Sequence, residues 1–288
     1  MTDQRARKNS KNERRTQLLK RPILAIFLIT LLFLTSAHAS ASALTVSAKH
    51  AILLDAVTGD VLFEKDADTR APMASTTKIA TAIAVIEALP LDREIRVPRE
   101  AVGVEGTSAY LKEGESLTVR DLLYALLLSS ANDAAVTLAI ACDGDIPTFA
   151  ARMNALALAL GLHNTHFENP HGLPSDEHYT TARELALLSA YAMHNPTFAQ
   201  IVGTKSYTCR SSTTVHTFRN HNKLLSFSGD AVGVKTGFTK KSGRCLVGAA
   251  EKDGARLISV TLAAPNDWND HTSLFHYGFS LLGVNGEG

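Results

Sequence analysis

The residues best suited to chemistry lie in the stretch MASTTKIATAIAVIEAL, Met73 to Leu89, where a serine and a lysine stand three residues apart. The apolar spacing predicts a helix, on which positions i and i+3 share a face, so the Lys78 amine can reach the Ser75 hydroxyl. A serine hydroxyl becomes a nucleophile when a base takes its proton, and burial lowers the pKa of a lysine toward that task. Ser75 and Lys78 are therefore candidates for nucleophile and base, although a lone Ser-x-x-Lys is more often a helix cap beside an exposed lysine.

Two further polar groups stand in apolar or strand-like surroundings. LLLSSANDAA places Ser130 and Asn132 between two apolar helical runs, and GVKTGFT places Lys235, Thr236 and Gly237 in a segment typical of a strand. Taken singly, the first group is a turn between helices and the second an exposed strand end. A second cation near the lysine of the first motif would lower its pKa further, and a shift of about three units corresponds to roughly 4 kcal/mol.

The elements that position these groups follow from the hydrophobic pattern. Two hairpin signals, around Thr58-Gly59-Asp60 and around Asp253-Gly254, lie near the two ends of the chain. Between them, helical patterns cover residues 76–89, 118–128, 131–141, 147–160 and 181–193. Residues 201–230 show strands and loops without a clear order. The sequence predicts an α/β fold, with an antiparallel β-sheet formed from both chain ends, flanking helices and an inserted, mostly helical subdomain.

Residues 1–41 predict a secretory signal peptide. A basic segment precedes Ile23 to Leu34, an uncharged apolar run of 12, and SAHASASA then supplies Ala-x-Ala cleavage sites. A bilayer span needs about 20 apolar residues, so an uncleaved anchor is the weaker alternative. We expect cleavage after Ala39 or Ala41, an exported and extracytoplasmic protein, and one domain over residues 42–288.

Removal of the leader makes the chain acidic. The leader holds eight of the 29 Lys and Arg residues and two of the 28 Asp and Glu residues, which leaves 21 basic against 26 acidic side chains and a net charge of −5. Nucleic acid is an unlikely partner, because binding its phosphate backbone requires a basic face.

The cysteines and histidines predict no cofactor and no metal site. Cys142, Cys209 and Cys245 are too few and too scattered for a disulfide framework or a zinc site, and Cys142 and Cys245 are predicted to be buried. One disulfide stays open in an oxidising compartment. His163, His166, His171 and His178 lie in a turn-rich segment without metal-ligand spacing, so we expect them on the surface or packed in loops.

In the order Ser-x-x-Lys, Ser-x-Asn, Lys-Thr-Gly, the three motifs resemble the active-site set of the penicillin-binding proteins and serine β-lactamases. The resemblance extends from about residue 49 to residue 282. APMASTTKIATA, LLLSSANDAAVTLA, GVKTGFTKKSGRCLVGAA and HYGF are similar to the low-molecular-weight D-alanyl-D-alanine carboxypeptidases, particularly the sporulation-type members. The sequence departs from the commonest pattern at Ala131, where glycine is usual, and at Val232, where many members have aspartate.

The resemblance implies a catalytic role for four residues. Ser75 would be the acylated nucleophile and Lys78 its base. Ser130 would relay a proton to the nitrogen of the leaving D-alanine. The backbone N–H groups of Ser75 and Phe238 would form the oxyanion hole.

It also implies how the substrate is held. Asn132 would bind the substrate amide, while Lys235 and Thr236 would bind the terminal carboxylate and keep the local field positive. Gly237 would let the strand backbone approach the substrate closely.

The function implied is that of a secreted serine-type DD-carboxypeptidase, which removes the terminal D-alanine from peptidoglycan stem peptides through an acyl-enzyme on Ser75. Its partners would be stem peptides ending in D-Ala-D-Ala and, as inhibitors, β-lactam antibiotics, with a membrane contacted only through an uncleaved leader. The alternatives are a β-lactamase, a DD-endopeptidase and a non-catalytic wall-binding relative. The sequence lacks the Glu-x-x-Leu-Asn segment of class A β-lactamases, and it ends soon after HYGF, so we expect no further β-rich domain or amphipathic tail.

Overall fold

The computed structural model describes residues 44–284 and shows a compact unit that begins at Thr45. The predicted leader, residues 1–41, lies outside the described residues and stays a prediction. A five-stranded antiparallel sheet has the strand order β2-β1-β9-β8-β7. Its strands are β1 (His50–Asp55), β2 (Val61–Lys65), β7 (Ala231–Thr239), β8 (Gly243–Lys252) and β9 (Ala255–Leu262). Because β1 pairs with β9, the prediction that both chain ends form one sheet is confirmed.

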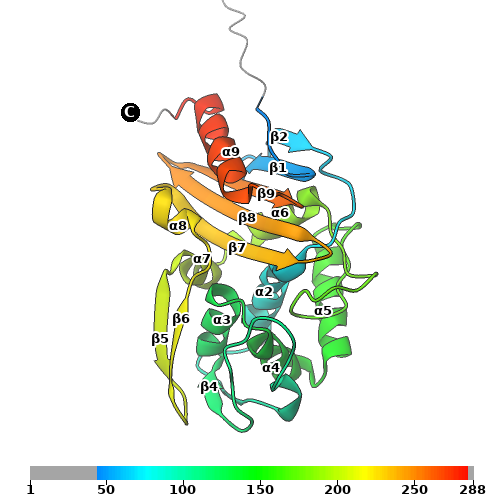
Figure 1. The fold of residues 1–288 in the computed structure, drawn as a ribbon, viewed down its shortest axis with the longest axis vertical. Helices are drawn as coiled ribbons and strands as arrows, with labels where there is room; N and C mark the ends of the chain where they lie inside the picture. The colour runs from blue at the N-terminus through cyan, green and yellow to red at the C-terminus, as the bar shows by residue number, and fades with distance from the viewer. Residues whose placement is uncertain (1–43, 285–288) are drawn as a thin grey trace, which may run out of the picture. The chain divides into compact units, whose positions relative to one another are not determined.

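Helices cover both faces of this sheet, with α9 (Asp267–Leu281) on one face and α6 (Ala182–Met193) on the other (Figure 1). Ser259 and Thr261 of β9 hydrogen-bond to His271 of α9 at 2.7 and 2.9 Å. Ile258 and Val260, which alternate with them, lie in the large hydrophobic core beneath the sheet. Successive side chains of a strand point to opposite faces of the sheet, so the polar residues of β9 contact α9 while the alternating apolar residues pack into the core.

The hairpin between β8 and β9 turns where the sequence predicts it. Asp253 and Gly254 have φ values of +47° and +84°. Two successive positive φ values define the type I′ turn, which suits the twist of a two-residue hairpin and favours Asp-Gly.

The helical part also agrees with the sequence pattern. Its helices are α2 (Lys78–Ala88), α3 (Val119–Leu128), α4 (Asn132–Asp143) and α5 (Ile146–Ala159). Thr118 and Asp121 form a capping box at the start of α3. The first two turns of α2, from Lys78 to Val85, are buried on every side. This central helix therefore carries its lysine into the interior.

Several shorter elements had no predicted bounds, and those within residues 201–230 lie where the sequence predicts strands and loops. They are η1 (Ala74–Thr77), β3 (Glu94–Arg96), η2 (Arg99–Ala101), β4 (Ser116–Thr118), α7 (Pro196–Gly203), β5 (Ser206–Arg210), β6 (Val215–Arg219) and α8 (Leu224–Phe227). β3 pairs with β4, and β5 pairs with β6. Pro196 starts α7, where the Asn195 side chain caps the free N–H groups.

One cysteine differs from its prediction. Cys142 is only partly buried, because α4 reaches the surface at its C-terminal end, where Asp143 pairs with Arg152 at 2.6 Å. Cys245 is buried as predicted, and all three cysteines are free thiols. Between residues 44 and 284, no single helix has the length and apolar character of a membrane span; α4 and α5 together do by length and composition only, and they are bent by 85°.

Candidate active site

Ser75 and Lys78 meet where η1 runs into α2. Ser75 is partly exposed, whereas Lys78 is fully buried. The Lys78 Nζ lies 3.0 Å from Ser75 Oγ, 2.7 Å from Asn132 Oδ1 and 2.7 Å from the carbonyl oxygen of His171. A neutral amine has two N–H donors and one lone pair. When it donates to Asn132 and His171, its lone pair is left facing the Ser75 hydroxyl.

The surroundings favour that neutral form. Burial lowers the pKa of Lys78 well below its ordinary value, the charge of Lys235 lowers it further, and Asp133 opposes the shift. Burial also lowers the pKa of Lys235, to about 7. Two lysines buried side by side therefore share a site in which at least one of them can be neutral near pH 7.

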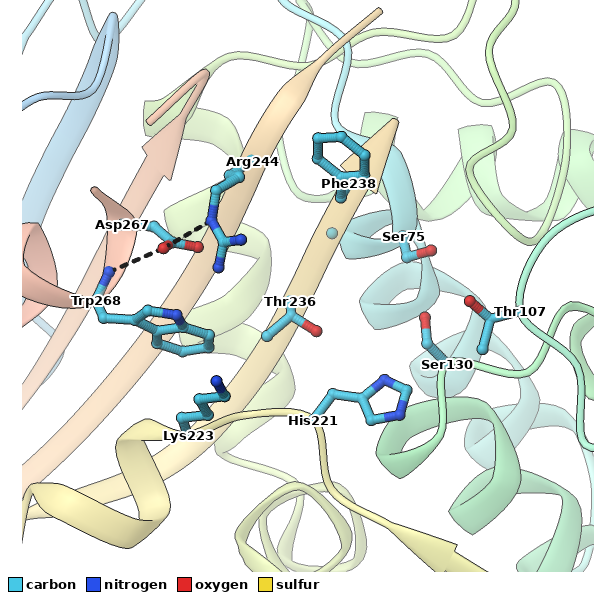
Figure 2. Close-up of a pocket in the computed structure, with 11 residues that line it drawn as sticks. Ser75, Thr107, Ser130, His221, Lys223, Thr236, Phe238, Arg244, Asp267 and Trp268 are labelled. Atoms are coloured by element: carbon cyan, nitrogen blue, oxygen red, sulfur yellow. Dashed lines mark hydrogen bonds and ion pairs between the residues drawn. The ribbon is translucent and has the colours of Figure 1, made fainter. Parts of the chain in front are cut away.

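Ser130 and Lys235 form the second polar pair. Ser130 lies in the short loop between α3 and α4 with a φ of +58°. The Lys235 Nζ is 3.1 Å from Ser130 Oγ and 2.9 Å from the carbonyl oxygen of Thr236. Figure 2 shows the side chains of Ser75, Ser130 and Thr236 gathered around the same open space. The three sequence motifs are thus brought together from α2, the α3–α4 loop and β7.

A glycine lets β7 lie against the nucleophile. A Cβ atom on Gly237 would stand 3.0 Å from the Ser75 backbone nitrogen, 3.1 Å from Ala74 Cβ and 3.2 Å from the carbonyl oxygen of Met73. Because those contacts are tighter than most Cβ atoms make, a side chain here would push strand and η1 apart by a few tenths of an ångström, and glycine permits their close approach. Phe238, next along the edge strand, is 66% exposed.

The cleft between these elements has a volume of ≈ 380 Å³. Beyond the motif residues, it is lined by Thr107, His221, Lys223, Arg244, Asp267 and Trp268. Arg244 donates to Asp267 at 2.9 Å, so this wall is held by an ion pair (Figure 2). Sequence patterns gave no sign of these residues, because they come from separate loops, from the start of β8 and from the unpredicted α9.

Two histidines of the turn-rich segment lie behind the nucleophile, and the sequence did not place them there. His178 Nδ1 accepts a hydrogen bond from the Glu168 N–H at 3.1 Å. Its other nitrogen, Nε2, must then carry the proton and donate to Thr77 Oγ1 at 2.7 Å. Thr77 in turn donates to the carbonyl oxygen of Ala74 at 2.8 Å. This chain of hydrogen bonds holds Ala74, which has a φ of +48° and directly precedes Ser75.

Both buried histidines are held neutral. Burial lowers the pKa of His171 to about 3 and that of His178 to about 4, and the Lys78 charge contributes to each shift. They therefore act as fixed hydrogen-bonding groups near neutral pH, as the expected loop-packing role implies. Within residues 44–284, no group of three or more His, Cys, Asp or Glu residues could hold a metal ion.

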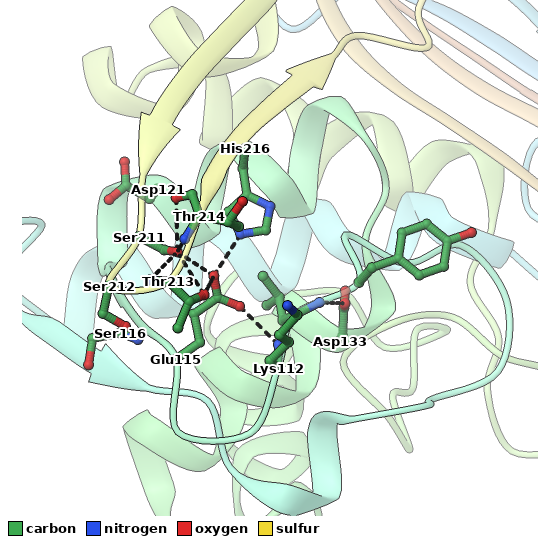
Figure 3. Close-up of polar contacts among 12 residues, drawn as sticks. Lys112, Glu115, Ser116, Asp121, Asp133, Ser211, Ser212, Thr213, Thr214 and His216 are labelled. Carbon is green, nitrogen blue, oxygen red and sulfur yellow. Dashed lines mark hydrogen bonds and ion pairs between the residues drawn. The ribbon is translucent and has the colours of Figure 1, made fainter.

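The wall opposite β7 is a loop fastened by two buried carboxylates (Figure 3). Asp133 accepts hydrogen bonds from Ser108 Oγ and from the backbone N–H groups of residues 109 and 111. Glu115 accepts from Ser211 and from His216 Nε2, the latter at 2.8 Å, which ties the loop to the hairpin β5–β6. The loop in turn positions Asn132, whose Nδ2 donates to the carbonyl oxygen of Glu105 at 2.6 Å.

Fold and site together define a class of enzyme: a serine hydrolase in which a buried lysine, rather than a histidine, contacts the candidate nucleophile Ser75, on a sheet-and-helix scaffold typical of penicillin-binding proteins. Comparison with known proteins gives the family. The D-alanyl-D-alanine carboxypeptidase family (peptidase S11) matches residues 36–266. The chain therefore belongs to this family, and it is a serine-type D-Ala-D-Ala carboxypeptidase, a hydrolase of the penicillin-binding protein class.

Individual relatives support the same assignment. The chain is 37% identical over 258 residues to a D-alanyl-D-alanine carboxypeptidase of Streptomyces sp. strain K15, which covers 82% of this chain and 89% of that protein. It is 33% identical over 278 residues to the carboxypeptidase DacF of Bacillus subtilis strain 168, covering 92% of this chain and 71% of the relative. The crystal structure of the Streptomyces K15 DD-transpeptidase superposes with a TM-score of 0.78 at 36% identity, covering 82% of this chain and 98% of that one.

Proposed function

We propose that this protein is an exported enzyme that removes the terminal D-alanine from peptidoglycan stem peptides through an acyl-enzyme on Ser75. The observation that carries the proposal is the placement of Lys78, a fully buried amine whose Nζ lies 3.0 Å from the Ser75 hydroxyl. Burial and a neighbouring positive charge both disfavour the charged form of a lysine, and a lysine with only a structural role would gain nothing from them. A general base requires a lowered pKa, and this surrounding supplies it.

In the acylation step, Ser75 Oγ attacks the carbonyl carbon of the penultimate D-alanine while Lys78 takes its proton. The carbonyl oxygen becomes an oxyanion, for which the backbone N–H groups of Ser75 and Phe238 are the proposed donors. The C–N bond then breaks, and Ser130 passes a proton to the leaving nitrogen, drawing it from the Lys235 ammonium 3.1 Å away. Free D-alanine departs and the ester on Ser75 remains.

Before the second step, a proton passes from Lys78 to Lys235 through solvent, so that Lys78 is neutral again and Lys235 is an ammonium. Water then attacks the ester, Lys78 accepts the proton of that water, and it gives the proton to Ser75 Oγ as the acyl–oxygen bond breaks, which restores the serine and releases the shortened peptide. An amine in place of water would give transpeptidation, the activity named for the Streptomyces K15 structure. We propose hydrolysis for this chain because its family and its Streptomyces and Bacillus relatives are named as carboxypeptidases.

The remaining motif residues would hold the substrate. Lys235 and Thr236 would bind the terminal carboxylate at the edge of β7. Asn132 uses Oδ1 and one N–H of its amide inside the protein, accepting from Lys78 and donating to Glu105. Its second N–H can then donate to a substrate carbonyl, so the residue would both orient the base and bind the amide.

A β-lactam presents a reactive carbonyl and a carboxylate at the spacing of an acyl-D-Ala-D-Ala end, so penicillin should acylate Ser75 as well. Because the substrate lies outside the cytoplasmic membrane, we also propose that residues 1–41 direct export and are removed. N-terminal sequencing of secreted protein should give a start near Ser40 or Ser42. A start at Met1 in a membrane fraction would mean an uncleaved anchor.

The activity is tested by D-alanine release from diacetyl-Lys-D-Ala-D-Ala, with Ser75→Ala as the inactive control. We expect stoichiometric release of one D-alanine per peptide from the parent enzyme. No release by folded parent protein would contradict the proposal. Rapid penicillin hydrolysis without D-alanine release would identify a β-lactamase instead, and cleavage of cross-linked dimers alone would identify an endopeptidase.

A further inference from the structure

A second hollow opens beside the catalytic cleft, at the far end of β7. It has a volume of ≈ 380 Å³ and shares Phe238 and Arg244 with the cleft. Three lysines complete its charged lining: Lys49, Lys240 and Lys241. We call these five residues the basic groove. Figure 2 shows Phe238 and Arg244, the two residues that the groove shares with the cleft, among the residues that line the cleft.

The basic groove contains two cations that the protein does not neutralise. Arg244 pairs with Asp267 at 2.9 Å, and Lys241 pairs with Asp176 at 2.6 Å. Lys49 and Lys240 are exposed and form no ion pair with any residue between 44 and 284. The chain beyond the leader carries a net charge of −5. The hollow therefore offers two exposed, unpaired lysines side by side with a paired arginine and a paired lysine.

The proposed binding mode sets the direction in which a substrate leaves the cleft. With the terminal carboxylate at Thr236 and the scissile carbonyl at Phe238, the peptide runs antiparallel to β7, and its acyl side continues toward Thr239 and Lys240. β7 is an edge strand of the sheet, so an extended peptide can add to it as a further strand. Strand residues advance about 3.3 Å each, and each step back along the antiparallel peptide is one step forward along β7. With the penultimate D-alanine level with Phe238, the third residue before the scissile bond lies level with Lys240.

We propose that the basic groove binds a carboxylate on the acyl side of the substrate, at the third residue before the scissile bond. The groove would act on specificity: it would favour acidic stem peptides over neutral ones of the same length. Phe238, 66% exposed, offers an apolar surface for the chain between the cleft and the groove. The inference rests on the proposed function, because the direction of the peptide follows from the assigned places of carboxylate and oxyanion.

The test compares acetyl-Ala-Glu-Lys-D-Ala-D-Ala with its Gln counterpart, acetyl-Ala-Gln-Lys-D-Ala-D-Ala. The quantity measured is the ratio of their kcat/KM values for D-alanine release, at low ionic strength. We expect the parent to prefer the Glu peptide by about three- to tenfold, as one or two exposed ion pairs give. The ratio should fall to within about twofold of unity in the double variant Lys49→Gln/Lys240→Gln, and in the parent as salt screens the charges.

Lys252→Gln is the matched control. Lys252 lines a different hollow, at the β8–β9 turn, and it too has no ion pair among the described residues. This variant should keep the parental preference for the Glu peptide. Loss of the preference in Lys252→Gln to the same extent as in the double variant would show an effect of net charge and would overturn the proposal.

Other outcomes separate the groove from the catalytic assignment. Equal kcat/KM for the two peptides in the parent, with normal release from diacetyl-Lys-D-Ala-D-Ala, would overturn the groove alone. No release from any of the three peptides would overturn the proposed function itself. If the two peptides react equally and a soluble glycerol phosphate polymer inhibits the parent but not the double variant, the groove binds a phosphate polymer and the peptide proposal is wrong.

Discussion

Replacement of Gly172 by alanine should slow acylation of a serine that it does not touch. Gly172 has a φ of +88°, and a Cβ atom there would stand 2.0 Å from the carbonyl oxygen of Ala74 and 2.9 Å from Thr77 Oγ1. Real Cβ atoms keep at least 3.0 Å from such neighbours, so the Ala74 carbonyl has to move by about 1 Å. Ala74 directly precedes the nucleophile and is held by Thr77. The displacement therefore passes to Ser75.

The expected size of the effect follows from that displacement. A misplacement of about 1 Å in a reacting group costs on the order of 10² in rate, so the second-order rate of acylation by a fluorescent penicillin should fall about 100-fold. The positive φ and the overpacking should together lower the free energy of unfolding by about 2–5 kcal/mol. Acylation is best measured well below the melting temperature, with circular dichroism to establish that the variant is folded.

Gly144→Ala separates the two effects. Gly144 has almost the same φ, +87°, but nothing lies within 4 Å of its Cβ position. This variant should lose stability from backbone strain alone and keep the parental acylation rate. A folded Gly172→Ala protein that acylates within about twofold of the parent, or a Gly144→Ala protein that is slowed equally, would refute the positioning of Ser75 through Ala74.

Three further predictions concern the charged groups. Lys78→Arg should lower the penicillin acylation rate by at least about 10², because a guanidinium does not give up its proton, and a rate near that of the parent in the folded variant would exclude Lys78 as the base. Both buried lysines bind fewer protons in the folded than in the unfolded state. The free energy of unfolding, measured by urea denaturation, should therefore rise between about pH 7, the folded-state pKa of Lys235, and pH 10.5, the ordinary pKa of lysine, and the acylation rate should rise with pH as Lys78 loses its proton. A free energy of unfolding that falls with pH over this window would contradict the burial of two titrating lysines. Burial raises the pKa of Glu115, but hydrogen bonds from Ser211 and His216 outweigh it and lower the pKa to about 2. Glu115 should therefore contribute stability above pH 4.5 that is lost as the pH falls toward 2. In thermal denaturation, Glu115→Gln should lose less melting temperature on acidification than the parent does.

The catalytic motifs were predictable because each is local in the sequence. Ser75 and Lys78 share one helix face, and the flanking helices and two hairpins have clear periods of hydrophobicity. The assembly of the motifs was predictable only through the resemblance to a family. No pattern in the sequence alone places Ser130 within 3.1 Å of Lys235, 105 residues away.

The parts that were missed are those where tertiary contacts override local pattern. The sequence of helix α9 has a polar character because it contains residues such as Asp270 and His271. Both are buried with partners: Asp270 accepts from Ser47, before β1, and His271 contacts Ser259 and Thr261 of the sheet. The short hairpin β5–β6 is held to the cleft wall by Glu115, far away in the sequence. Such elements owe their stability to long-range hydrogen bonds, which composition and periodicity do not reveal.

The central claim, that Ser75 is the nucleophile activated by this buried lysine site, is tested most directly by the location of the penicillin adduct. Intact mass spectrometry of the protein after brief exposure to penicillin, followed by peptide mapping, measures it. We predict one adduct per chain, on the peptide that contains Ser75, and no adduct on a folded Ser75→Ala variant. An adduct on any other residue, or one that persists in Ser75→Ala, would contradict the assignment of the nucleophile.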